Sequence, residues 1–209
     1  MAERLNAPVL KTGDGVTRPG VRIPPPPLPA GASAPGGDIV SALPYRIATL
    51  IYIFDGHGKT FLLERRRAPN LGLLSPIGGK LEQENGESPY QCAARELAEE
   101  AGIHVPVTAL RLMGIIAERG FEGTGHWLMF CFELVTPILP AEREMPEGAM
   151  RWIELAALDS LNIPKTDRDV IWPLVKSHSH RLGNTTGEVF SAFIDCTGRD
   201  DLMVNIERA

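Results

Sequence analysis

Short apolar and β-branched stretches recur along the chain after residue 43, and their spacing predicts strands rather than long helices. The first two predicted strands, Arg46–Phe54 and Thr60–Glu64, flank a turn at Asp55–Gly58 and should form a hairpin. The remaining predicted strands are Leu110–Glu118, Trp127–Val135, Arg151–Leu155, Val189–Ile194 and Leu202–Ile206, the last two forming a closing hairpin. A linker at Gly120–Gly125 and a long polar loop at residues 136–150 separate some of them.

One segment, residues 88–102, has a helical period instead. Ser88 is a predicted N-cap, Pro89 the first helical residue, and Gln91 completes a capping box, while Gly102 ends the helix. One side of this helix carries apolar residues that should face the core: Tyr90, Ala94, Leu97 and Ala101.

A second helix is predicted from a cap at Thr166 or Asp167 to about Ser177. Pro173 lies inside it and should break or kink it, because proline cannot donate the backbone hydrogen bond that a helix interior needs.

The first helix carries three glutamates on one face, Glu96, Glu99 and Glu100. At these spacings like charges repel by roughly 0.2–0.5 kcal/mol per pair. They also lie in the last turn, at the negative end of the helix dipole, where each carboxylate costs about 0.3–1 kcal/mol. A divalent cation would reverse these effects, since oxygen ligands suit magnesium or manganese. A solvated acidic face is the alternative.

Composition narrows the class of protein. The chain has 209 residues and a formal charge of -5, which argues against binding a nucleic-acid polymer but not against nucleotides. The three cysteines are far apart, which favours buried thiols in a reducing, cytoplasmic compartment over a disulfide framework. Neither a membrane span nor a signal peptide is expected. Residues 1–42 are rich in proline and glycine and read as a disordered or surface-draped extension, or as a polyproline II ligand for a partner.

The glycine pair before the helix and the glutamates on it form one ordered set. Gly79, Glu87, Arg95-Glu96-Leu97, Glu99-Glu100 and Gly102-Ile103 resemble the Nudix box, the signature of hydrolases that cleave nucleoside diphosphates linked to another group. From Glu87 onward every defining position matches. Upstream, seven residues separate Gly79 from Glu87, where the family pattern has five. The longer loop can bulge outward, because added loop length costs little closure entropy.

The resemblance implies an α+β protein with the Nudix fold, an α/β/α sandwich with a mixed β-sheet between helices, over residues 43–209. It implies Mg²⁺, or Mn²⁺, held by Glu96, Glu99 and Glu100. Glu99 and Glu96 are both candidates for the general base. Arg95 would orient Glu99 one turn later, or else merely balance surface charge, and Glu87 would complete the catalytic set.

Residues from about Tyr45 to Glu207 are similar to the MutT-type hydrolases of oxidised purine nucleoside triphosphates. This similarity implies that Glu147 adds a carboxylate to the metal site and that Asp167 reads the base edge, although either could be a solvated or capping residue. It also implies substrate contacts from Ser75, Gly78, Gly79 and Lys80. Where these enzymes place an asparagine, this chain has Ser75-Pro76, and a hydroxyl offers fewer hydrogen bonds than an amide.

The expected activity is therefore metal-dependent hydrolysis of a nucleoside triphosphate, of the 8-oxo-dGTP kind, to the monophosphate and pyrophosphate. Hydrolysis of ADP-ribose or of a dinucleoside polyphosphate is an alternative substrate choice. A non-catalytic module that binds a nucleotide and regulates is the alternative class, although a module of that kind has no need for repelling carboxylates.

Overall fold

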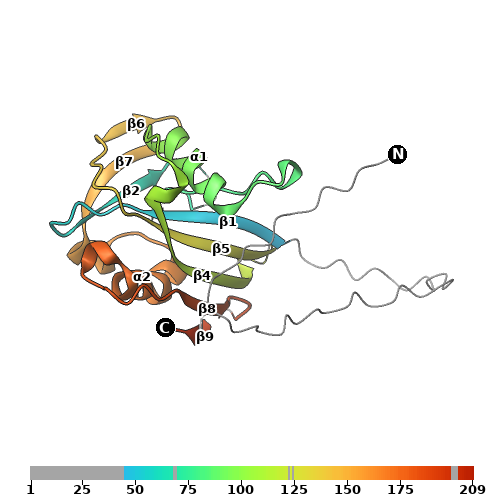
Figure 1. Ribbon diagram of the computed structural model, residues 1–209. Helices are drawn as coiled ribbons and strands as arrows, with labels where there is room; N and C mark the ends of the chain where they lie inside the picture. Colours follow the sequence, from blue (N-terminus) through green and yellow to red (C-terminus); the bar gives the residue numbers. More distant parts are fainter. Residues whose placement is uncertain (1–44, 68–69, 122, 124, 199–201) are drawn as a thin grey trace, which may run out of the picture. The chain divides into compact units, whose positions relative to one another are not determined.

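The computed structural model describes residues 45–67, 70–121, 123, 125–198 and 202–209 (Figure 1). The predicted extension, residues 1–42, and its proline-rich stretch lie outside this part of the chain.

The main layer is a mixed five-stranded sheet in the order β1-β5-β4-β8-β9. Its strands are β1 (Tyr45–Tyr52), β4 (Leu110–Phe121), β5 (Gly125–Leu134), β8 (Phe190–Asp195) and β9 (Met203–Arg208). β1 runs parallel to β5 and β4 parallel to β8, whereas β4–β5 and β8–β9 are antiparallel. The predicted closing hairpin is thereby confirmed. The predicted linker at 120–125 is shorter than expected, because β4 continues to Phe121 and β5 starts at Gly125.

A second, antiparallel sheet has the order β3-β2-β7-β6. Its strands are β2 (Lys59–Arg65), β3 (Leu74–Ser75), β6 (Arg143–Met145) and β7 (Gly148–Glu154). The sequence prediction of a polar loop over 136–150 is therefore wrong from Arg143 onward, whereas residues 136–142 form no helix or strand. β6 has few apolar residues, and it forms a strand because β7, already paired with β2, offers it a hydrogen-bonding edge.

The predicted hairpin of the first two strands is also largely wrong, because β1 and β2 join different sheets. A single antiparallel bridge, Phe54 to Thr60, remains beside the turn. Both edges of β1 are taken by other segments: β5 pairs along one, and residues 77–80 along the other, through hydrogen bonds from Thr49 N to Gly79 O (2.9 Å) and Ile51 N to Ile77 O (2.7 Å). This second contact brings the glycine pair to the middle of the fold.

The first predicted helix is α1 (Pro89–Ala101). Its capping box between Ser88 and Gln91 and its left-handed end at Gly102 are confirmed. Its buried face differs from the prediction. Tyr90 packs edge-on against Phe132 but is 38% exposed. The buried positions are Cys92, Ala93, Glu96, Leu97 and Glu100, so two of the three clustered glutamates are not solvated.

The second predicted helix consists of a π-helical turn, η4 (Asp167–Ile171), continued by α2 (Trp172–His178). Pro173 does not end the helix, because helical backbone angles run on from Thr166 through Trp172, and the π-helical turn ends at Ile171, just before the proline, whose missing N–H interrupts the hydrogen-bond ladder. The predicted cap is not formed, because Thr166 already has helical backbone angles and makes no side-chain capping bond. Short 3₁₀ helices complete the chain: η1 (Gln83–Asn85), η2 (Val107–Ala109), η3 (Leu155–Ser160) and η5 (His180–Leu182).

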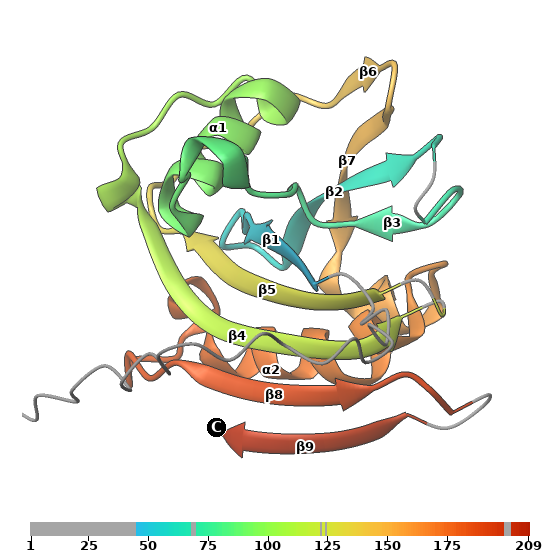
Figure 2. The same cartoon turned by 90° about the vertical axis from the view of Figure 1, so that its right-hand side faces the viewer.

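Figure 2 shows α1 and the small sheet on one side of the large sheet and α2 on the other. Alternate residues of β1 and its continuation feed two cores: Ile51 and Ile53 pack with α1 and the small sheet, and Tyr52 and Phe54 pack with η4 and α2. The predicted α+β sandwich around a mixed sheet is confirmed, with the small sheet as an addition. Cys92 and Cys131 are buried and Cys196 is partly buried, all three as free thiols. No helix of the described residues is long and apolar enough to cross a membrane.

Candidate active site

The lengthened loop before α1 folds into the compact turn η1. Its residues 82–86 are exposed, so the extra length bulges outward as expected. Gly86 ends the turn in the left-handed conformation, and Glu82 N donates to Glu87 Oε2 at 2.8 Å. Asn85 Nδ2 donates to Glu82 Oε2 at 2.7 Å. The insertion therefore leaves Glu87 beside α1.

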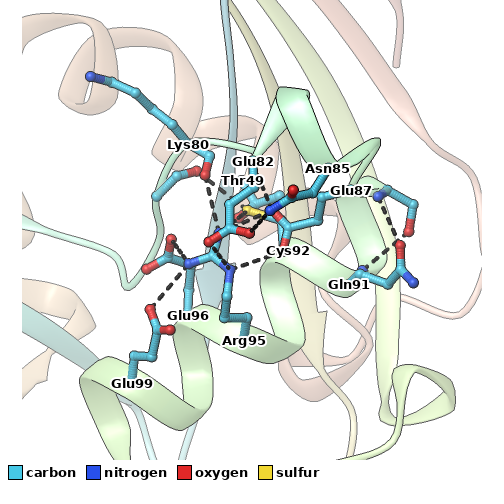
Figure 3. A network of polar contacts seen from close by, with 12 residues as sticks. Thr49, Lys80, Glu82, Asn85, Glu87, Gln91, Cys92, Arg95, Glu96 and Glu99 are labelled. Carbon is cyan, nitrogen blue, oxygen red and sulfur yellow. Dashed lines mark hydrogen bonds and ion pairs between the residues drawn. The ribbon is translucent and has the colours of Figure 1, made fainter.

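Arg95 is the centre of a network of carboxylates (Figure 3). Its Nε and Nη2 donate to the two oxygens of Glu87 at 2.9 and 3.0 Å. Its Nη1 donates to Glu96 Oε1 at 2.8 Å and to Glu99 Oε2 at 3.1 Å. The hydrogen bonds from Arg95 lower the pKa of the Glu87 carboxyl. Arg95 thus contacts Glu99 as its spacing predicted, and it contacts two further carboxylates as well.

Gly78 lies against Glu100 and Gly79 lies against Glu96. Gly78 N donates to Glu100 Oε2 at 3.2 Å. A Cβ on Gly79 would lie 2.0 Å from Glu96 Oε1, so only glycine permits the chain to pass so close to Glu96. β1 holds this segment in place through the backbone bonds described above.

A cavity of about 260 Å³ is lined by Glu96, Glu99, Glu100, Met145, Pro146 and Glu147. The structure thus brings Glu147, at the tip of the β6–β7 hairpin, to the glutamates of α1. Burial raises the pKa of Glu96, and it raises that of Glu100 to about 7, with the charges of Glu96 and Glu147 acting in the same direction. Glu87 does not line this cavity and contacts Arg95 instead.

This carboxylate cavity suits a hard divalent cation in its chemistry. Burial disfavours the charged forms of Glu96 and Glu100 more than neighbouring groups favour them, so the pKa values of both carboxyls rise. A bound cation would stabilise the charged forms. The side chains do not converge on a single point: among the described residues no group of three or more histidine, cysteine or acidic side chains stands ready around one ion. Glu96 and Glu99 each give an oxygen to Arg95, so metal binding needs small rotations of these side chains.

A second, larger cavity of about 350 Å³ lies on the other side of the glycine pair. Its lining includes the predicted substrate residues Ser75, Gly78, Gly79, Lys80 and Asp167. Ser75 is buried, and its Oγ has no hydrogen-bond partner among the described residues. Such an unsatisfied hydroxyl costs free energy unless a ligand or water bonds to it.

Two acidic residues that face this cavity are held partly neutral. Burial raises the pKa of Asp167 to about 7, and the nearby charge of Glu118 adds to the effect. Burial likewise raises the pKa of Glu118 to about 7, against a hydrogen bond from Thr166. Among the described residues, the side-chain hydrogen-bond partner of both carboxyls is the neutral hydroxyl of Thr166. The cavity therefore offers hydrogen-bonding groups without a fixed charge partner.

Among the lining residues that were not predicted from the sequence are Glu118 and Trp127. Glu118 could have been found from the sequence, because it occupies an inward-facing position of β4. Gly114 and Ile116 precede it on the same face, which is otherwise apolar. Arg65 ends β2 and lines the larger cavity, and its charge opposes the rise in the pKa of Glu100.

Comparison with known proteins agrees with this geometry. Residues 44–172 match the model of the NUDIX domain. An RNA pyrophosphohydrolase of Dinoroseobacter shibae is 30% identical over 125 residues, which are 59% of this chain and 69% of that protein.

Solved structures share the fold. A MutT protein of Bacillus halodurans superposes with a TM-score of 0.59 at 23% identity, over 78% of this chain and 97% of that one. A bifunctional NMN adenylyltransferase/ADP ribose pyrophosphatase of Francisella tularensis, complexed with AMP and a manganese ion, has a TM-score of 0.55 at 18% identity, over 66% and 43%. Because the NUDIX model covers more than half of the chain, from β1 through η4, this protein belongs to the Nudix family of hydrolases, which act on phosphorus-containing anhydrides and generally depend on a divalent metal.

Proposed function

We propose that this protein hydrolyses a nucleoside triphosphate to the monophosphate and pyrophosphate, with Mg²⁺ as its metal and an oxidised purine of the 8-oxo-dGTP kind as its base. We also propose that residues 43–209 form the catalytic domain after an N-terminal extension, and that the enzyme works in the reducing cytoplasm. The buried free thiols of Cys92 and Cys131 support that compartment.

The proposal is supported above all by the position of Gly78–Gly79, where the larger cavity and the carboxylate cavity adjoin. Both glycines line the larger cavity, while Gly78 N bonds to Glu100 and Gly79 abuts Glu96 in the carboxylate cavity. A base in the larger cavity would direct its phosphates across these glycines toward the glutamates. Arg65 lines the larger cavity and its charge acts on Glu100, so it would meet phosphate charge on this path.

Hydrolysis adds water across one phosphoanhydride bond, and the bridging oxygen leaves with the second phosphate. The bound metal would neutralise charge on the phosphoryl oxygens, with Glu96, Glu99, Glu100 and Glu147 as its ligands. Glu99 or Glu96 would take the proton of the attacking water. Arg95 would orient both through its Nη1, and Glu87 would fix the guanidinium from its other side.

The larger cavity would select the base, and Asp167 would contact its edge. Replacing Asp167 by alanine should raise KM for the preferred nucleotide about tenfold, the equivalent of one hydrogen bond of ~1.4 kcal/mol, while kcat changes little. Steady-state kinetics checks this. Asp169→Ala is the matched control, because Asp169 is exposed and pairs with Lys165 at 2.8 Å. A tenfold fall in kcat with unchanged KM for Asp167→Ala would contradict a role in base binding.

A panel of substrates tests the function itself. Release of pyrophosphate or phosphate should be measured with and without Mg²⁺ for 8-oxo-dGTP, the ordinary nucleoside triphosphates, ADP-ribose, a dinucleoside polyphosphate and RNA with a 5′-triphosphate. ADP-ribose and RNA are included because of the names of the two similar proteins above. We expect 8-oxo-dGTP to give the highest kcat/KM. A higher kcat/KM for another compound would identify that compound as the substrate instead. If no compound releases pyrophosphate or phosphate, a nucleotide-binding module without catalysis would be favoured.

A further inference from the structure

The C-terminal end of α1 has no cation of its own. Its last turn contains no basic residue, although it carries Glu99 and Glu100 and the negative end of the helix dipole. Gly102 N caps the carbonyl oxygen of Ala98, and the carbonyls that follow it lack partners within the helix. Arg95 pairs with Glu99 one turn earlier, and a positive group from elsewhere in the chain would stabilise the carbonyl end itself.

Arg143, the first residue of β6, supplies that group. Its Nη2 donates to the carbonyl oxygen of Glu99 at 3.3 Å and to that of Glu100. Its Nη1 lies 3.2 Å from the place where a Cβ on Gly102 would stand. Gly102 therefore serves both the left-handed turn and the approach of the guanidinium.

The same contact fixes the position of Glu147. The hairpin is tight: Arg143 pairs with Met150 and Met145 with Gly148, so Glu147 lies in the turn only four residues after Arg143. Among the described residues, the hydrogen bonds from this hairpin to α1 come from Arg143. At the tip, Glu147 lines one cavity together with Glu96, Glu99 and Glu100, which are carboxylates of like charge. Repulsion thus pushes the tip away from α1, and Arg143 opposes it.

We propose that Arg143 is a positioning residue that holds Glu147 against the glutamates of α1 and so sets the affinity of the site for a divalent cation. This inference rests on the proposed function, because it takes the carboxylate cavity as the metal site.

The test measures metal binding without turnover. Mn²⁺ is titrated into the nucleotide-free full-length protein, and free Mn²⁺ is followed by electron paramagnetic resonance. Arg143→Met should raise Kd for Mn²⁺ about tenfold, a size typical of residues that orient metal ligands. Arg143→Lys should recover part of the affinity. Arg151→Met is the matched control, because Arg151 lies on the same hairpin but pairs with the exposed Glu144, and it should bind Mn²⁺ as the unaltered protein does.

A double-mutant cycle separates positioning from a general loss of structure. Glu147→Gln should weaken Mn²⁺ binding about as much as Arg143→Met, and the double variant should be no weaker than Glu147→Gln alone, because both changes remove the same ligand. Additive effects, or an unchanged Kd in Arg143→Met, would overturn the proposal. If Arg143→Met does not fold, Arg143→Lys takes its place in the cycle. If the unaltered protein binds no Mn²⁺, the metal site assumed in the proposed function is refuted, and with it the role of Arg143.

Discussion

Glu100→Gln should lower kcat by about 10²-fold to 10³-fold, equivalent to ~3–4 kcal/mol of lost transition-state stabilisation, without loss of the fold. Glutamine keeps the shape of the side chain and can still accept the hydrogen bond from Gly78 N. It removes the negative charge that the metal and the phosphoryl group would need. Glu99→Gln should be similarly inactive.

Stability should change in the opposite direction from activity. Burial raises the pKa of Glu100 to about 7, so the metal-free native state binds a proton that the unfolded chain releases above its ordinary pKa of about 4.5. The associated stability is present below about pH 4.5 and is lost as the pH rises through 7. Glu100→Gln should therefore melt at the same or a higher temperature than the unaltered protein at pH 8 in a metal chelator.

Two measurements check this prediction: steady-state kinetics with Mg²⁺, and thermal unfolding followed by circular dichroism from pH 5 to 8. Glu84→Gln is the matched control, because Glu84 is exposed on η1 close to the site but outside the carboxylate cavity. It should leave both kcat and the melting temperature unchanged. A kcat for Glu100→Gln within threefold of normal would remove this residue from the proposed site.

The neighbouring glycines should respond differently to the same substitution. A Cβ on Gly78 would lie 2.0 Å from the carbonyl oxygen of Thr49, so the backbone of β1 or of the glycine segment must shift. Gly78→Ala should therefore destabilise the protein by about 1–3 kcal/mol. A Cβ on Gly79 meets the carboxylate of Glu96, which is the movable end of a side chain. Gly79→Ala should keep most of the stability but lower kcat by about 10²-fold, because Glu96 would be displaced from the site.

Urea unfolding and steady-state kinetics on both variants test this pair, and each variant serves as the control for the other. The distinctive result is that stability falls mainly at position 78 and activity mainly at position 79. If Gly79→Ala were fully active, the close approach to Glu96 would have no part in catalysis. Equal stability of the two variants would contradict the contact with Thr49.

Local signals were sufficient for α1. Ser88, Pro89, Gln91 and Gly102 act through neighbours within one turn, so both ends of the helix could be read from the sequence. The same holds for β1, β4 and β5, whose apolar residues contribute to both cores. The resemblance of the box to a known family, carried by Arg95 and the glutamates, could likewise be read without coordinates.

Long-range pairing explains what could not be predicted. Whether β1 pairs with β2 or with β5 depends on which edges other segments occupy, and the weakly apolar β6 exists because β7 lies beside it. Burial of Glu96 and Glu100 also arises from segments far along the chain, since the glycine pair and the β6–β7 hairpin close over them.

By itself, the sequence determined the helix, the order of its carboxylates and the family, because these depend on spacings within one segment. The resemblance left Glu147 open between the metal site and a solvated loop, and only the tertiary structure decided that it faces those carboxylates. Only the tertiary structure revealed that Arg143 neutralises the end of their helix and that Glu118 and Asp167 share one cavity. Each of these contacts joins residues distant in sequence, and the packing of both sheets fixes their separation.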